Sequence, residues 1–197
     1  MTLILASASE IRQKMLRNVG LSFESRPVRI DEDTIRLSLT AEGAKPRDIA
    51  DALAEFKARR GAEKNPDCLV LGSDQILALE GEVLSKPTDR DAAARDLKKM
   101  AGKTHHLFSG AVFYEDSKPV WRHVGVAKLT MHSLSDVQIA AYLDKAWPDV
   151  SGCVGSYQAE ALGGQLFSRI DGDWFSVLGL PLLEVLSYLR LRGMVGS

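Results

Sequence analysis

The amino-acid sequence predicts an α/β protein, because segments with strand-like and with helical hydrophobic patterns alternate along the chain. Leu3–Leu5 and Leu69–Leu71 are short apolar runs typical of buried strands, and apolar residues recur at helical spacing in the segments between them. The chain has 197 residues, of which 45% are hydrophobic. This length and composition predict a single domain over residues 1–197, with a core large enough for two lobes around one cleft.

The first segment places a buried strand directly before a helix. After Leu3–Leu5, apolar residues follow a helical spacing at Ile11, Met15, Leu16 and Val19. Gly20 is expected to end this helix. Ser7 or Ser9 can cap its start, and Ser7 has capping-box spacing with Glu10.

The same segment has the composition of an anion site. A helix start offers unpaired backbone N–H groups and the positive end of the helix dipole, which attract a phosphate. The hydroxyls of Ser7 and Ser9 and the guanidinium of Arg12 lie beside that position. We therefore predict a phosphate cradle here, with an ordinary capped helix and a surface arginine as the alternative.

Two elements are predicted before the second buried strand. Val28–Asp33 has the pattern of a strand that ends in acidic residues. Pro46 suits the first turn of a helix, since proline needs no hydrogen-bond partner there. The apolar stripe of this helix consists of Ile49, Leu53 and Phe56.

The central strand is predicted in two pieces. Leu69–Leu71 is apolar, the polar block Gly72–Gln75 interrupts it, and Ile76–Leu79 continues it. Residues 80–82 form a turn, because they read Glu-Gly-Glu. The polar block is thus expected at a strand end, facing a cleft.

The second half of the chain is predicted to begin with a helix and two strands. Thr88 caps a charged, alanine-rich helix that Gly102 ends. Residues 104–114 and 119–131 form strands joined by a polar turn near Asp116 to Lys118.

The chain is predicted to close with two helices and a hairpin. Ser135 and Gln138 have capping-box spacing and begin a helix that runs to about Ala146. The polar turn Asp171–Asp173 then separates two further apolar runs, and Pro181 follows the second run. The resulting elements are a hairpin of Gln165–Ile170 with Trp174–Leu178 across Asp171–Asp173, and a last helix from Pro181 to about Gly193.

Asp74 is the strongest candidate for chemistry. Its place between two apolar runs puts a carboxylate at the end of a strand, where open α/β sheets bind ligands. Such a carboxylate needs a cation or an activated water as its partner, and a turn-capping aspartate is the alternative.

Asp31, Glu32 and Asp33 form a second acidic group. Together with Asp74 they predict a site for a hard divalent cation, and alone they suit a solvated loop.

Two lysines can balance these acids. Lys57 borders the buried face of its helix, from which its side chain either snorkels to solvent or reaches a cleft. Lys86 precedes Pro87, which fixes the backbone just after it. Together with Arg12, these lysines carry enough positive charge to neutralise a triphosphate.

Bulk composition excludes several classes of function. A formal net charge of −1 gives no electrostatic footprint for a nucleic-acid backbone, so no nucleic-acid partner is expected. Cys68 and Cys153 stand apart, which argues against a disulfide framework or structural zinc and favours a cytoplasmic protein. No apolar run is long enough to be a signal peptide or a membrane span, so no membrane partner is expected.

The sequence lacks the residue patterns of histidine metal sites, serine nucleophiles and glycine-rich nucleotide-binding loops. The four histidines show no helical metal-ligand spacing, and adjacent His105 and His106 point to opposite faces of a strand. Ser109 and Ser168 have no recognisable base or nucleophile elbow. The sequence also has no Walker-type or dinucleotide glycine motif.

The blocks along the chain, taken jointly and in order, resemble the Maf family of nucleoside triphosphate pyrophosphatases. They cover nearly the whole sequence, which makes the joint pattern far more specific than any part of it. The blocks are Leu5-Ala6-Ser7-x-Ser9-x-x-Arg12, Asp31-Glu32, Leu53-Ala54-x-x-Lys57-Ala58, Ser73-Asp74-Gln75, Lys86-Pro87, Gly155-Ser156-Tyr157 with Glu160, Ile170 to Asp173, and Val177 to Leu182.

The resemblance implies a two-lobed α/β fold with an elongated mixed sheet, helices flanking it and a nucleotide cleft between the lobes. It implies hydrolysis of a nucleoside triphosphate to the monophosphate and pyrophosphate, with Mg²⁺ or Mn²⁺ as cofactor. It also implies a cytoplasmic protein, with homodimers among its relatives. House-cleaning of the nucleotide pool and a link to cell division are the biological roles it implies.

The resemblance also assigns roles to residues. Ser7, Ser9 and Arg12 bind the phosphates, and Glu32 with Asp74 holds the cation. Asp74 also accepts the proton of the attacking water. Lys57 and Lys86 stabilise charge on the α-phosphoryl group and on the leaving pyrophosphate.

Base preference rests on four positions. Gln75 and Glu160 are similar to the branch of the family that prefers 7-methyl-GTP. A carboxylate suits the N–H donors of guanine and the positive charge of its 7-methylated ring. Ile11 stands where that branch has an aromatic residue, and Glu10 stands where it has proline, so the chain offers apolar contact with the base without a stacking ring.

Three alternatives stay open at this point. The first is an enzyme of the same family that acts on thymidine and uridine triphosphates or on several modified nucleotides. The second is a nucleotide-binding regulator of cell division without turnover, against which the joint presence of Asp74, Glu32, Lys57 and Lys86 argues. The third is a plain phosphatase, which would release orthophosphate.

Overall fold

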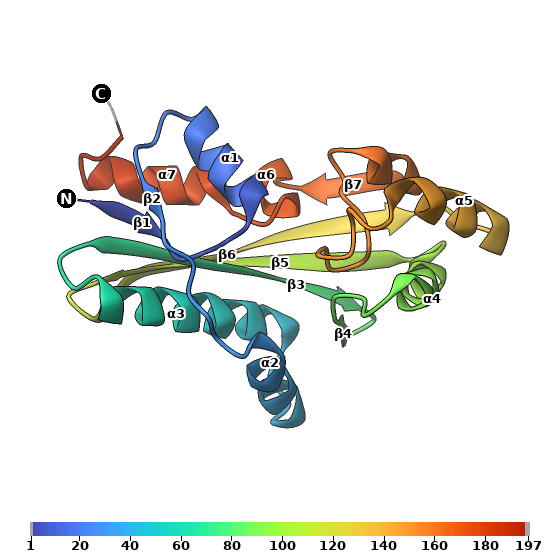
Figure 1. The fold of residues 1–197 in the computed structure, drawn as a ribbon, viewed down its shortest axis with the longest axis horizontal. Coiled ribbons are helices and arrows are strands. Elements are labelled where there is room, and N and C mark those ends of the chain that lie inside the picture. The colour runs from blue at the N-terminus through green and yellow to red at the C-terminus, as the bar shows by residue number, and fades with distance from the viewer. Residues whose placement is uncertain (1, 196–197) are drawn as a thin grey trace.

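The computed structural model describes residues 2–195, and their strands form one seven-stranded mixed sheet (Figure 1). The strand order is β2-β1-β3-β5-β6-β7, with β4 paired to β3 off this path. β1 runs parallel to β2 and β3, whereas the other pairs are antiparallel. The strands are β1 (Leu3–Leu5), β2 (Glu24–Ser25), β3 (Leu69–Leu79), β4 (Glu82–Leu84), β5 (Thr104–Glu115), β6 (Lys118–Met131) and β7 (Phe167–Gly172). The predicted α/β class is therefore confirmed.

Helices cover both faces of this sheet. α1 and α7 pack over one face near the chain termini, and α3 packs on the opposite face (Figure 1). α4 and α5 cover the far end of the sheet around a second apolar cluster. The helices are α1 (Glu10–Asn18), α2 (Glu32–Ala41), α3 (Pro46–Lys64), α4 (Arg90–Met100), α5 (Asp136–Ala146), α6 (Trp174–Val177) and α7 (Leu182–Leu191), with a 3₁₀ helix η1 at Leu162–Leu166.

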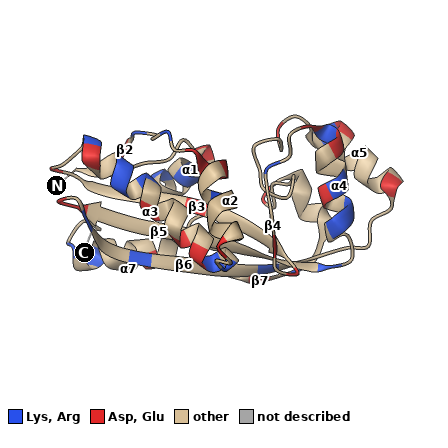
Figure 2. Ribbon diagram, turned by 90° about the horizontal axis from the view of Figure 1, so that it is seen from below, with Lys and Arg blue, Asp and Glu red and all other residues tan. Residues whose placement is uncertain are grey.

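The helices on the first face form two separate blocks, which give the molecule two lobes. Side chains on a strand alternate between faces, so Leu71 under α1 and α7 and Leu77 under α4 and α5 lie on the same face. Figure 2 shows the α1 region and the α4–α5 region as two bodies joined by the long strands. A space therefore opens between the blocks, above the middle of β3.

Two glycines allow α3 to lie very close to the sheet. A Cβ atom on Gly72 would lie 2.2 Å from the carbonyl oxygen of Ala54, and one on Gly110 would lie 2.5 Å from that of Ala50. Neither contact is physically tolerable, so these positions require glycine. The close approach explains why α3 presents alanines to the sheet and why its one buried lysine lies near β3.

The central strand differs from its prediction, because β3 continues through Gly72–Gln75 without a break. Polar residues suggested an interruption, but Gly72 serves helix packing and Ser73 and Asp74 are buried within the strand. Pairing with β5 runs unbroken from Val70 to Ala78. The polar block thus lies in the middle of the strand and not at its end.

The predicted strand at Val28–Asp33 is wrong. Asp31 caps α2 instead, since its side chain accepts the N–H of Thr34 at 3.0 Å. Ile30 of this segment, together with Ile35 and Leu39 of α2, packs against the start of α3. Local capping therefore prevails over the extended pattern.

The predicted hairpin at Gln165–Leu178 is also wrong. β7 pairs with β6, while Trp174–Val177 forms the short helix α6. Asp173 starts this helix by accepting the N–H groups of Phe175 at 3.3 Å and Ser176 at 2.7 Å.

The other predicted elements are confirmed with small shifts at their ends. The long strands β5 and β6 and the helix beginning at Pro46 lie where predicted, and the capping box of Ser135 with Gln138 is formed. Asp89 and not Thr88 caps α4, because its carboxylate accepts the N–H of Ala92 at 2.7 Å.

Candidate active site

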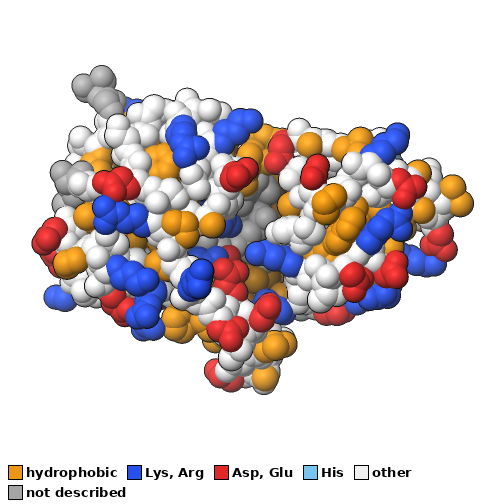
Figure 3. Space-filling view, viewed as in Figure 1, with side chains coloured by type: hydrophobic (Ala, Val, Ile, Leu, Met, Phe, Trp, Pro, Cys, Tyr) orange, Lys and Arg blue, Asp and Glu red, His pale blue; other side chains and the backbone are white. Residues whose placement is uncertain are grey.

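A cleft of about 410 Å³ lies between the two lobes, over the middle of β3. The surface is hollowed there, with charged side chains of both signs around the hollow (Figure 3). The cleft brings together predicted site residues from six regions of the chain. All ten predicted site residues line it: Ser7, Ser9, Ile11, Arg12, Glu32, Lys57, Asp74, Gln75, Lys86 and Glu160.

Lys57 and Asp74 form the buried centre of the cleft. Asp74 lies in β3 opposite Gly110 of β5, where a side chain would collide with α3. The ammonium of Lys57 reaches across from α3 and donates to Asp74 Oδ1 at 2.7 Å. Lys57 and Asp74 are buried, with exposed fractions of 7% and 8%, so bulk water solvates neither charge and each needs the other as its partner. The lysine therefore does not snorkel to solvent.

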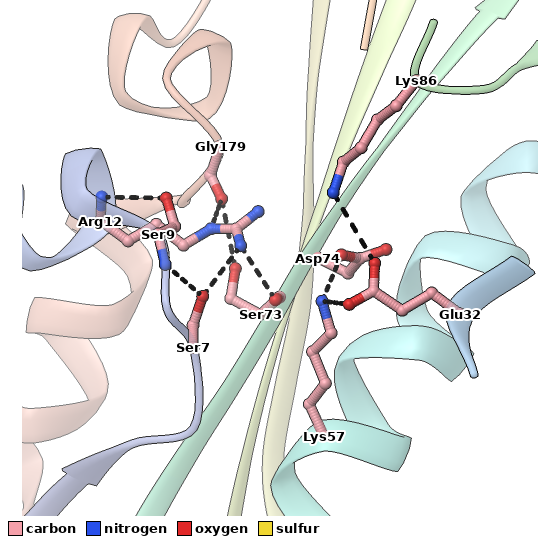
Figure 4. Close-up of polar contacts among 9 residues, drawn as sticks. All are labelled: Ser7, Ser9, Arg12, Glu32, Lys57, Ser73, Asp74, Lys86 and Gly179. Carbon is pink, nitrogen blue, oxygen red and sulfur yellow. Dashed lines mark hydrogen bonds and ion pairs between the residues drawn. The ribbon is translucent and has the colours of Figure 1, made fainter. Parts of the chain in front are cut away.

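Glu32 completes this centre from α2. Its Oε1 lies 2.8 Å from Lys57 Nζ, so one ammonium joins two carboxylates, and Lys86 Nζ lies 4.0 Å from its other oxygen (Figure 4). Burial alone would raise the pKa of the Glu32 carboxyl, but Lys57, Lys86 and Arg12 outweigh it and lower that pKa below its usual value. Glu32 is therefore ionised at neutral pH.

The other members of the predicted acidic group do not join the centre. Asp31 is used as the cap of α2, and this bonding to Thr34 lowers the pKa of its carboxyl. Asp33 is exposed and pairs with Arg36 at 2.9 Å. Of the three consecutive acids, only Glu32 lines the cleft with Asp74.

Arg12 forms a second cationic group on the opposite side of β3 (Figure 4). Its Nε donates to the carbonyl of Gly179 at 2.7 Å, and its Nη1 donates to Ser73 O at 3.2 Å and Ser7 Oγ at 3.3 Å. Burial lowers the pKa of this guanidinium, and the charges of Asp74 and Glu32 raise it in part. An arginine remains protonated despite such a shift.

The serines beside Arg12 build the start of α1. Ser9 is the cap, since its Oγ accepts the N–H of Arg12 at 3.5 Å, and Ser7 Oγ accepts the N–H of Ser9 at 3.3 Å. Of the two capping residues predicted, Ser9 is therefore the one used. The helix start and Arg12 face the same cleft, as a phosphate cradle requires.

The predicted base-reading residues Gln75, Glu160 and Ile11 come from three separate segments of the cleft lining. The Gln75 amide nitrogen donates to Ser176 O at 3.0 Å and Val177 O at 3.1 Å. Backbone carbonyls only accept, so the amide orientation is fixed and its oxygen points elsewhere. Glu160 is exposed at the rim, and Ile11 contributes apolar surface.

Part of the cleft wall was not predicted from the sequence. This wall is supplied by Leu107, Cys153, Val154, Tyr157 and Val177. The block Gly155-Ser156-Tyr157 was the available signal, because Gly155 and Ser156 both adopt positive φ and turn Tyr157 inward. Tyr157 is anchored by His105, whose Nε2 lies 2.7 Å from the Tyr157 hydroxyl. Burial lowers the pKa of His105 to about 4, so this histidine is neutral at neutral pH.

The donor set of the cleft fits a hard divalent cation. Asp74 and Glu32 both direct an oxygen to one position, which the Lys57 ammonium occupies. Within residues 2–195, no three His, Cys, Asp or Glu side chains gather at metal-binding distance. Mg²⁺ commonly uses one or two carboxylates together with water and substrate phosphates, which matches two protein ligands.

Among residues 2–195, no helix combines the length and the apolarity needed to cross a bilayer.

The fold is of the α/β class, and its cleft gathers the acidic and basic groups that catalysis on a phosphorylated substrate needs. Residues 2–192 match the family model described as Maf-like protein, so the chain belongs to the Maf family. It is 70% identical to a nucleoside triphosphate pyrophosphatase 1 of Jannaschia sp. (strain CCS1), over 98% of both chains. It is 53% identical to a nucleoside triphosphate pyrophosphatase of Roseobacter denitrificans, over 97% of this chain and 96% of the relative. It is also 45% identical to a 7-methyl-GTP pyrophosphatase of Brucella suis biovar 1, over 95% and 94%. The predicted family is thus confirmed.

Replacing Lys57 by Met should destabilise the protein by about 3 kcal/mol at neutral pH, because two carboxylates then face each other without a counter-charge. In the wild type, the lowered pKa of Glu32 gives stability that is present above about pH 4.5 and is lost as the pH falls through the folded-state value. In Lys57→Met, protonation of either carboxylate at low pH relieves the repulsion between Glu32 and Asp74. The stability difference should therefore shrink between pH 7 and about pH 4, as measured by urea unfolding.

Lys64→Met is the matched control, since Lys64 is exposed on the same helix. It should change the free energy of unfolding by less than about 0.5 kcal/mol. A Lys57→Met deficit that stays constant or grows on acidification would contradict the paired-carboxylate account.

Proposed function

We propose that this protein hydrolyses a nucleoside triphosphate to the nucleoside monophosphate and pyrophosphate, favouring 7-methyl-GTP or another modified nucleotide. The observation that carries the proposal is the Lys57 ammonium joined to Asp74 and Glu32 in a cleft that Arg12 also lines. Two acids for a cation, several basic groups for phosphates and a large wall for a base are the parts this reaction needs. The names of the relatives support the same activity.

The phosphates would lie between the start of α1 and the two lysines. Ser7 and Ser9 supply hydroxyls, the α1 start supplies backbone N–H groups, and Arg12 supplies a fixed positive charge. Lys86 is exposed at the rim, where it can meet the incoming triphosphate. The substrate is thereby oriented with its α-phosphorus toward the middle of β3.

Asp74 is the proposed general base. One of its oxygens accepts from Lys57, and no group within residues 2–195 donates to the other oxygen. That oxygen can take the proton of a water molecule as the water attacks the α-phosphorus. The bond from that phosphorus to the bridging oxygen breaks, and pyrophosphate leaves with the bonding electrons. Lys57 and Lys86 offset the negative charge that develops.

Glu32 and Asp74 would hold Mg²⁺ or Mn²⁺, which, when bound, neutralises phosphate charge and polarises the phosphoryl oxygens. The Lys57 ammonium already lies between these carboxylates, so it keeps them oriented toward one another. Such orientation limits the rearrangement needed when substrate arrives.

Base preference is proposed from the acceptors on the cleft wall. Because the Gln75 nitrogen is used by α6, the polar atom that remains for a ligand is its carbonyl oxygen. Glu160 adds a carboxylate at the rim. Guanine offers N–H donors on its pairing edge, and methylation at position 7 adds positive charge, so both acceptors favour this base.

Asp74→Asn should lower the rate of pyrophosphate release by about 1,000-fold while the fold survives, since the amide cannot accept the water proton. The measurement is pyrophosphate and orthophosphate release from 7-methyl-GTP with Mg²⁺ or Mn²⁺, with circular dichroism as the folding control. Unchanged turnover would contradict the role of Asp74. Orthophosphate in place of pyrophosphate would indicate a phosphatase, and no release from any nucleotide by the wild type would favour a binding regulator.

Glu160→Gln should reduce the preference for 7-methyl-GTP over GTP by about tenfold, because the carboxylate charge that favours the cationic ring is lost. The ratio of kcat/KM for the two substrates measures this, alongside uridine and thymidine triphosphates. Asp149→Asn, an exposed change outside the cleft lining, is the control. A wild-type preference for the pyrimidine nucleotides would overturn the base assignment and keep the enzyme class.

A further inference from the structure

Arg12 is held in place by a segment from the other end of the chain. Gly179, 167 residues away in sequence, accepts the Arg12 Nε–H at 2.7 Å through its backbone carbonyl. Ser73 Oγ donates to the same carbonyl at 3.2 Å, so this oxygen joins α1, β3 and the α6–α7 turn (Figure 4). The bond between Arg12 and Gly179 is shorter than the Arg12 bonds to Ser7 and Ser73.

These contacts fix the position of the whole guanidinium, and they do not use its Nη2 nitrogen. The guanidinium is planar and rigid, so fixing Nε and Nη1 also fixes Nη2. Within residues 2–195, no acceptor is bonded to Arg12 Nη2, and Figure 4 shows this nitrogen on the side of the guanidinium nearer to Asp74 and Lys86. Arg12 thus presents a fixed donor to the cleft before any ligand arrives.

Residue 179 must be glycine for this contact. Its backbone has φ of +100°, which other residues adopt only under strain. A Cβ atom there would lie 3.3 Å from Arg12 Nη2 and 3.5 Å from Nε. A Cβ atom at this position would therefore crowd the guanidinium, which would have to shift by a few tenths of an ångström.

We propose that Gly179 is a positioning residue, whose carbonyl and missing side chain hold Arg12 in the orientation that binds the phosphates. This inference rests on the proposed function, since it takes Arg12 as a phosphate ligand. Gly179 touches no reacting atom itself. Its contribution is to remove the motion of a long side chain before binding, which would otherwise reduce affinity.

The segment that carries Gly179 is built to stay rigid. Asp173 begins it with three hydrogen bonds, to the N–H groups of Phe175 and Ser176 and to the Ser176 hydroxyl. Ser176 lies so close to β6 that a Cβ atom on Gly125 would lie 2.1 Å from its hydroxyl oxygen. The carbonyl of Gly179 is therefore a fixed point for Arg12 to bind.

Gly179→Ala tests the proposal, with Gly81→Ala as the matched control. Gly81 has a similar φ of +90°, but a Cβ atom there meets nothing within 4 Å. Both variants carry backbone strain, and only Gly179→Ala disturbs Arg12. We expect Gly179→Ala to raise KM for the triphosphate and the Kd for inorganic pyrophosphate about tenfold, with kcat within about twofold of wild type. Gly81→Ala should leave KM and Kd within about twofold of wild type.

The outcomes separate this inference from the proposed function. Equal KM and Kd values for the two variants, in a wild type that releases pyrophosphate, would overturn the role of Gly179 and keep the function. A wild type that releases no pyrophosphate from any nucleotide would overturn the function. In that case equal affinities of Gly179→Ala and Gly81→Ala for inorganic pyrophosphate would also overturn the positioning role.

A second measurement uses the wild type and stands even if Gly179→Ala does not fold. The Nε–H resonance of Arg12, identified by its absence from spectra of Arg12→Lys, should exchange with solvent at least about tenfold more slowly than that of exposed Arg47. Exchange as fast as that of Arg47 would show that the bond to Gly179 does not hold the guanidinium and would overturn the proposal.

Discussion

The contact between the Lys57 ammonium and the carboxylates of Asp74 and Glu32 is the constraint on which the cleft depends. These groups come from α3, β3 and α2, and each is expensive to bury without the others. The contact exists only because Gly72 and Gly110 let α3 lie against the sheet. Two glycines, which contribute no side chain to the cleft, therefore set the position of the charged groups, and the backbone packing of α3 is part of the site.

The cleft has two halves supported in different ways. On the α3 side, the Lys57 ammonium and the carboxylates of Asp74 and Glu32 hold one another through opposite charges, with Lys86 nearby. On the α1 side, backbone carbonyls of residues 176, 177 and 179 hold Arg12 and Gln75 through directed hydrogen bonds. One half therefore rests on charge pairing, whereas the other rests on directed hydrogen bonds to the backbone. β3 runs between them and places Asp74 beside Ser73 and Gln75, so both halves meet at a single strand.

Much of the site could be predicted from the sequence, and less of the fold around it. Strong local patterns predicted the helices that begin at Pro46 and after Ser135, and the Maf resemblance supplied ten site residues that all lie in the cleft lining. The continuous β3, the helix α2 and the short α6 were missed, because burial of Ser73 and capping by Asp31 and Asp173 depend on tertiary neighbours and local bonds that hydrophobic spacing does not encode. The anchoring of Arg12 by Gly179 joins opposite ends of the chain, which no local pattern could reveal. The divalent cation, the homodimer and the cytoplasmic location stay predictions.

The central claim is that water held by Asp74 attacks the α-phosphorus and that pyrophosphate leaves intact. Turnover of 7-methyl-GTP in water enriched in oxygen-18, followed by mass spectrometry of both products, tests it directly. The account predicts one labelled oxygen in the nucleoside monophosphate and none in the pyrophosphate, because the new bond forms at the α-phosphorus. Label in pyrophosphate, or in orthophosphate, would place the attack at another phosphorus and contradict the assignment of this cleft.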